Sequence, residues 1–96
     1  MKRDETPLLT SVQVAEAQGM GEKLARLRVA RRIRQGDAAA RAGLSRSTAA
    51  LIEKGDPGRT LAQVLRYLEA ISPGLTLLAL LQNEDPSLLA LAARER

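Results

Sequence analysis

The chain has 96 residues, a length typical of one small domain with short tails. It contains no cysteine and no histidine, which excludes disulfides, cysteine nucleophiles, histidine general bases and the usual zinc ligands. We therefore expect neither a metal site nor a cofactor. The first residues, MKRDETPLLTS, contain no long apolar run, so the sequence predicts no signal peptide and no membrane span, and we expect a cytoplasmic protein.

Positive charge is concentrated in the middle of the chain. The whole sequence has a formal net charge of +4. Residues 22–59 alone hold ten Lys or Arg against four Asp or Glu, a net +6, whereas the segments on either side each carry −1. A polyanionic backbone is the natural partner of such a basic stretch. The alternative is a solvated basic face on an arginine-rich protein.

The N-terminal third predicts one weak helix and one strong helix. Thr10 is a suitable cap for a short helix over residues 10–18. Gly19 and Gly21 are expected to interrupt that helix, because glycine is a poor helix former. A stronger helix is predicted over residues 20–32. At helical spacing, its inward face holds Leu24, Leu27 and Arg28.

The stretch QGDAAARAGLSRSTAALIEKG predicts two short helices joined by a tight turn. The first would span residues 35–42 and the second residues 46–54. Gly43 can adopt a positive φ at the end of the first helix without steric cost, and Ser45 can cap the second. Ala39 lies four residues before Gly43 and keeps the side chain small where the two helices meet. This spacing indicates a helix-turn-helix.

A fourth helix is predicted over residues 61–71, after the turn sequence Gly55-Asp56-Pro57-Gly58. Thr60 and Gln63 have the spacing of a capping box at its start. Its apolar face is formed by Leu61, Val64, Leu65, Leu68 and Ile71.

The C-terminal tail is rich in leucine. Residues 75–81, LTLLALL, are apolar on every side, so periodicity leaves open whether they form a buried strand or one or two helical turns. Asp85-Pro86 is a good start for one last short helix. A domain this small leaves little surface to cover these side chains, so we expect the tail to pack against a second copy in a homodimer. The alternative is that it folds back on its own domain. The expected interface residues are Leu75, Leu77, Leu78, Leu80, Leu81 and Leu88.

Residues 20–71 resemble the Cro/C1-type (Xre) helix-turn-helix family. The resemblance rests on Gln35 at the start of a helix, on the AxxxG spacing that ends at Gly43, and on the sequences LSRST and IEKG that follow. It implies an all-α, lambda-repressor-like fold of four to five short helices that binds double-stranded DNA. The stretch GDPGRTLAQVLRYLEAISPGLTLLALL also resembles the antitoxins that partner Hip-type kinase toxins. That second resemblance implies a toxin partner and, at residues 75–81, a strand that pairs across the dimer.

The resemblance also implies which residues contact DNA. In that family the second helix of the pair lies in the major groove, and its first residues reach base edges. By position, the base-reading residues are Arg46, Ser47, Ala50 and Leu51. Arg46 is the best candidate, because its guanidinium can bond O6 and N7 of one guanine; the alternative is a phosphate contact. The phosphate-binding residues are Arg34, Gln35, Thr48, Lys54, Arg59 and Thr60.

Other positions bear on the packing of the fold. Arg28 and Glu53 match a semi-buried ion pair of that family, which ties the first helix to the end of the third. Ala38 and Ala49 stand where that family usually has larger aliphatic residues, and Arg34 stands where a Ser or Thr cap is common. Either the helices pack more closely here, or the domain depends on dimerisation for its stability.

The predicted organisation is an N-terminal arm over residues 1–19, a DNA-binding domain over residues 20–72 and a dimerisation extension over residues 73–96. The predicted function is a homodimeric transcriptional repressor that binds a near-palindromic operator, either as an autoregulating antitoxin or as a stand-alone regulator. A protein-interaction module that has lost specific DNA reading is the alternative. We do not expect an enzyme, because the carboxylates of Glu53 and Asp56 are more simply an ion pair and a turn residue than a catalytic pair.

Overall fold

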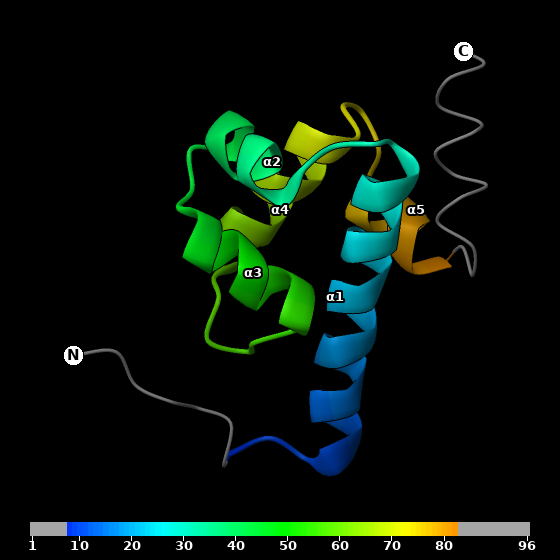
Figure 1. The fold of residues 1–96 in the computed structure, drawn as a ribbon. Helices are drawn as coiled ribbons and strands as arrows, with labels where there is room; N and C mark the ends of the chain where they lie inside the picture. The colour runs from blue at the N-terminus through cyan, green and yellow to red at the C-terminus, as the bar shows by residue number, and fades with distance from the viewer. Residues whose placement is uncertain (1–7, 83–96) are drawn as a thin grey trace.

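The computed structural model describes residues 8–82, which form five α-helices and, within that range, no strand (Figure 1). The helices are α1 (Ser11–Ala30), α2 (Gln35–Ala42), α3 (Arg46–Lys54), α4 (Leu61–Ile71) and α5 (Leu77–Gln82). The expected all-α fold class is confirmed. The bounds of α2, α3 and α4 are those that the sequence predicts. None of the helices in the described range is long and apolar enough to cross a membrane.

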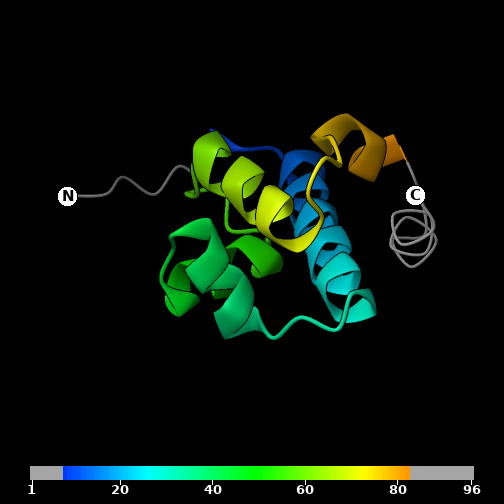
Figure 2. The same cartoon turned by 90° about the horizontal axis from the view of Figure 1, so that it is seen from above.

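α1 is the longest helix, and α3, α4 and α5 contact it. α2 contacts both α3 and α4, while α3 lies against α1, and α5 lies beside α1 at the side away from α3 (Figures 1 and 2). The core between these helices holds Leu24 and Leu27 from α1, Ile52 from α3, and Val64, Tyr67, Leu68 and Ile71 from α4. This arrangement leaves the outer side of α3 uncovered within the described part of the chain.

α1 is one continuous helix, so the expected interruption at Gly19 and Gly21 is wrong. Thr10 starts it with a capping box, in which the Thr10 hydroxyl accepts from the Gln13 amide at 3.1 Å and the Gln13 side chain accepts from the Thr10 amide at 3.0 Å. A Cβ at Gly19 would have nothing within 4 Å. One at Gly21 would lie 2.6 Å from the carbonyl oxygen of Glu53. Tertiary contact therefore compensates the poor helix propensity of Gly21, and α1 runs across the expected boundary between residues 19 and 20.

The turn between α2 and α3 has the geometry that the sequence predicts. Gly43 adopts φ 69°, and the next amide, of Leu44, donates to the carbonyl of Ala39 at 2.9 Å. The Ser45 hydroxyl caps α3 by accepting from the Thr48 amide at 3.1 Å. A glycine ends α3 in the same way, because Gly55 adopts φ 76°.

α2 and α3 meet through small side chains. Ala38 and Ala49 are each 0% exposed, and Ala39 is 2% exposed. The methyl groups of Ala38 and Ala49 stand in the core at positions where the Cro/C1-type family usually has larger aliphatic side chains. Of the two alternatives, this contact favours closer packing of the helices.

Residues 77–82 form helix α5, so the strand considered for residues 75–81 is wrong. Leu80 is 0% exposed and belongs to the core of its own chain, with Leu75 and Leu77 packed partly against that core. Residues 75–80 therefore pack on their own domain, as in the alternative to a dimer interface. Leu78 and Leu81 are 69% and 44% exposed. Leu88 lies outside the described residues.

Candidate nucleic-acid interface

α3 has one buried face and one exposed face. Ala49 and Ile52 turn into the core, whereas Arg46 and Ser47 in the first turn are exposed. Ala50 and Leu51, the other residues expected to reach bases, are half-buried. The exposed face therefore offers polar groups mainly at its N-terminal end, and α3 lies at the side of the molecule opposite α5 (Figure 1).

Three hydroxyl groups gather at this exposed end of α3. The Ser45 oxygen lies 3.1 Å from that of Ser47 and 3.0 Å from that of Thr48. Each hydroxyl can both donate and accept. The cluster is exposed and adjoins Arg46, so one short segment presents a cation and several adaptable hydrogen-bonding groups.

The expected phosphate ligands fall into two groups. Arg34 and Lys54 are exposed, and Arg34 makes no side-chain hydrogen bond as the N-cap of α2. Thr60 is also exposed, but its hydroxyl caps α4 by accepting from the Gln63 amide at 3.1 Å, and its own amide donates to the Gln63 side chain at 3.0 Å. The Thr60 amide is therefore already bonded. The predicted capping box at Thr60 and Gln63 is present.

Arg59 lies differently from the other cations of this region. Its side chain is only 9% exposed, and its Nε is buried without a hydrogen-bond partner. The nearest carboxylate oxygen, Oδ2 of Asp56, is 3.9 Å away. The Nε of Arg59 therefore faces inward, unlike the exposed side chains of Arg34 and Lys54.

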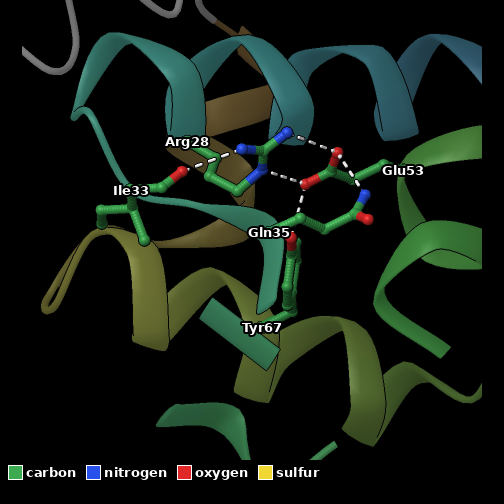
Figure 3. Close-up of polar contacts among 5 residues, drawn as sticks. All are labelled: Arg28, Ile33, Gln35, Glu53 and Tyr67. Atoms are coloured by element: carbon green, nitrogen blue, oxygen red, sulfur yellow. Dashed lines mark hydrogen bonds and ion pairs between the residues drawn. The ribbon is translucent and has the colours of Figure 1, made fainter. Parts of the chain in front are cut away.

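A buried polar network lies behind α3 (Figure 3). Arg28 of α1 donates from Nε to Oε2 of Glu53 at 2.6 Å and from Nη2 to Oε1 at 3.1 Å. Gln35 of α2 donates to the same Oε1 at 3.1 Å, and Tyr67 of α4 donates to Oε2 at 2.5 Å. Arg28 also donates to the carbonyl of Ile33 at 2.8 Å. Groups from three other helices thus converge on one carboxylate at the end of α3.

The network determines the charge state of its members. Burial favours the neutral form of Glu53, but hydrogen bonds from Arg28, Tyr67 and Gln35 outweigh it and hold the pKa of this carboxyl below its ordinary value of 4.5. Burial, followed by the hydrogen bond to Glu53, raises the pKa of Tyr67 well above that of a free tyrosine. The hydrogen bond to Glu53 raises the pKa of Arg28. The ion pair is therefore charged at neutral pH and holds α3 against α1.

The position of Gln35 bears on its expected role. One hydrogen of its side-chain amide is used by Glu53. The amide nitrogen carries a second hydrogen that a phosphate oxygen can accept. Gln35 thus braces the end of α3 and keeps one donor free for a phosphate.

Two residues of α4, Arg66 and Tyr67, contact α2, α3 or the turn between them, and neither contact is predicted from the sequence. Tyr67 donates to Glu53. The one signal for this contact in the sequence is that Tyr67 is the single tyrosine of the chain, because a buried tyrosine hydroxyl usually has a hydrogen-bond partner. Arg66 donates from Nε to the carbonyl of Ala42 at 3.0 Å and from Nη2 to that of Gly43 at 2.9 Å. The positive charge of Arg66 near these carbonyls also interacts favourably with the negative, C-terminal end of the α2 dipole. Arg66 therefore fastens the turn between α2 and α3 to α4.

A family model described as a helix-turn-helix domain matches residues 19–81. The chain belongs to this helix-turn-helix family. The match covers α1 from residue 19 onward, all of α2, α3 and α4, and α5 up to residue 81. Comparison with curated proteins and with solved structures gives no match. Membership of the family supports DNA as the partner.

Proposed function

We propose that the chain is a transcriptional repressor that binds double-stranded DNA sequence-specifically, with α3 in the major groove. The observation that carries this proposal is the exposed first turn of α3, where Arg46 and Ser47 point away from a core-facing side formed by Ala49 and Ile52. A helix presented in this way fits the major groove with its N-terminal residues at base edges.

Sequence reading in this proposal depends chiefly on Arg46. Its planar guanidinium can donate to two acceptors of one guanine, a contact worth about 1–3 kcal/mol of discrimination. Ser47 can contact either a base or a phosphate. Ala50 and Leu51 have no side-chain donor or acceptor, so their part in reading is apolar contact with a thymine methyl.

The proposed phosphate contacts surround this reading end. Arg34 and Lys54 are exposed cations at the start of α2 and the end of α3. The second hydrogen of the Gln35 amide and the hydroxyls of Thr48 and Thr60 are the proposed neutral donors. The concentration of positive charge in residues 22–59 would attract the polyanionic duplex over a longer range.

The proposed assembly is a homodimer on a near-palindromic operator. Two copies of α3 would enter successive major grooves about 34 Å apart. Leu78 and Leu81 support this assembly, because they leave apolar surface on α5 exposed. The finer proposal, an autoregulating antitoxin with a toxin partner, depends only on the resemblance of residues 55–81.

Selection of bound sites from a random pool of duplex DNA tests the function. We expect an enriched sequence with two inverted half-sites about one helical turn apart, and a steep loss of affinity between about 50 and 200 mM salt. A single asymmetric site would contradict the dimer.

The half-buried Leu51 and the few polar groups beyond the first turn of α3 favour a second candidate function, a protein-interaction module. Recovery of no enriched sequence would replace the repressor with that module.

A further inference from the structure

A cavity of about 210 Å³ lies beneath the C-terminal end of α3. Its walls come from α1, from the turn between α3 and α4, and from the first turn of α4. Most of the side chains that line it are apolar, including Met20, Ile52, Pro57, Leu61 and Val64. Leu61 is 64% exposed and lies at its rim. A dry apolar cavity of about 150 Å³ can hold benzene, so this space suits a molecule of roughly that size or slightly larger.

Two charged residues, Arg59 and Asp56, stand in this otherwise mostly apolar lining. The Arg59 side chain lines the cavity, is 9% exposed, and has a buried Nε with no hydrogen-bond partner. A buried donor without an acceptor is unfavourable, and a bound ligand, water or ion is one way in which native proteins satisfy such a group. The ion pair with Asp56 is long, at 3.9 Å, so it leaves much of the attraction of the guanidinium available.

Asp56 is held away from Arg59 by its own turn. Its Oδ1 accepts from the amide of Gly58 at 2.8 Å, which fixes the carboxylate in an Asx turn. A water molecule alone would be a poor occupant, because it needs two to four polar partners and most of the wall is apolar. A molecule with an apolar body and one anionic head matches both the wall and the guanidinium.

We propose that this cavity binds a small organic carboxylate with a hydrophobic body about the size of benzoate, with Arg59 as the partner of the carboxylate. The apolar body would cover Leu61 and lie against Met20 and Val64. Gly55, which ends α3, also lines the cavity, so the ligand would contact the base of the helix that faces DNA. This site is separate from the exposed first turn of α3, and binding there does not require the protein to bind DNA.

The test is a titration of the full chain, without DNA, followed by amide chemical shifts in NMR. Benzoate is the probe, and benzyl alcohol is its uncharged counterpart of similar size. We expect saturable benzoate shifts at Gly55, Asp56 and Leu61 with a dissociation constant of about 1 mM, and affinity for benzyl alcohol at least about tenfold weaker. Equal affinity for the two probes, or shifts that never saturate, would overturn the proposal.

Two substitutions with opposite expected effects test the role of Arg59. Arg59→Met keeps the apolar volume but removes the charge and should weaken benzoate binding at least about tenfold. Asp56→Asn keeps an oxygen for the Gly58 amide but removes the competing negative charge and should tighten binding. Arg26→Met, an exposed arginine on α1, is the matched control and should leave affinity unchanged. Unchanged binding in Arg59→Met, or no gain in Asp56→Asn, would refute the site. Loss of DNA binding alone would not bear on it.

Discussion

Gly21 of α1 lies directly against Gly55, the residue that ends α3. A Cβ at Gly21 would lie 2.7 Å from the amide nitrogen of Gly55, so no side chain fits at this crossing. A Cβ at Gly55 would in turn meet the carbonyl oxygen of Ala17, again backbone that cannot move aside cheaply. α1 and the end of α3 are therefore in backbone contact, and two glycines determine how closely they approach.

This contact predicts opposite effects for two substitutions in one helix. Gly21→Ala should destabilise the fold by about 1–3 kcal/mol, because the new methyl group forces α1 away from α3. Gly19→Ala is the matched control, since nothing lies within 4 Å of its Cβ. It should stabilise the fold by about 0.5–1 kcal/mol through helix propensity alone. Chemical denaturation of both variants measures the difference, and equal effects would contradict the close approach.

The network around Glu53 predicts a specific acid sensitivity. Its pKa is lowered in the folded state, so its contribution to stability is complete above about pH 4.5 and is lost as the pH falls further. Glu53→Gln should cost up to about 3–5 kcal/mol at pH 7, because it leaves Arg28 as a largely buried charge without its partner. The difference from the parent protein should shrink as the pH falls from 5 to 2. Denaturation at a series of pH values measures it, and a constant difference would contradict the lowered pKa.

Arg66 should affect both stability and DNA binding without touching DNA. Arg66→Gln removes charge-assisted bonds to the carbonyls of Ala42 and Gly43 and should cost about 1–2 kcal/mol of stability. We expect weaker binding to the selected operator at a temperature where the variant is fully folded, because the turn that orients α3 has lost its anchor. Arg26→Gln makes the same change of charge on an exposed face and serves as the control. Equal losses of operator affinity in the two variants would show that Arg66 contributes only through long-range electrostatic attraction.

Arg46 should determine one position of each half-site. Arg46→Ala is expected to lose about 1–3 kcal/mol of binding free energy on the best site and to relax the base preference at a single base pair per half-site. Stability should stay within about 0.5 kcal/mol, because the side chain is exposed. Binding to a set of singly substituted operators measures the preference. Uniform loss on every sequence would assign Arg46 to the phosphate backbone.

The exposed and buried leucines of α5 should separate dimerisation from folding. The double substitution Leu78→Glu and Leu81→Glu places charge on exposed apolar surface and should shift the protein to monomer in sedimentation while the helical circular dichroism remains. Leu80→Ala should instead cost about 2–5 kcal/mol of stability, because Leu80 is fully buried in its own core. A dimer that survives the double substitution would place the interface elsewhere.

Much of the fold could be predicted from short-range signals. The bounds of α2, α3 and α4 follow from Ser45, Thr60 and the glycines at the helix ends, whose effects act over about one helical turn. The exposed position of Arg46 follows from the same signals, because the cap at Ser45 and the core residue Ile52 determine which side of α3 faces out. The partnership of Arg28 with Glu53, which are 25 residues apart, could be expected only through a family resemblance.

The sequence by itself determined the helix-turn-helix, its caps and the basic character of the region around it, because each depends on neighbouring residues and on composition. The tertiary structure alone decided that Gly21 is needed and Gly19 is not, since the two differ only in what lies across from them. It also decided that Leu80 and Arg59 turn inward, and that Tyr67 reaches Glu53 from another helix. Such contacts join residues far apart in the chain, and their free energy depends on how the helices pack together.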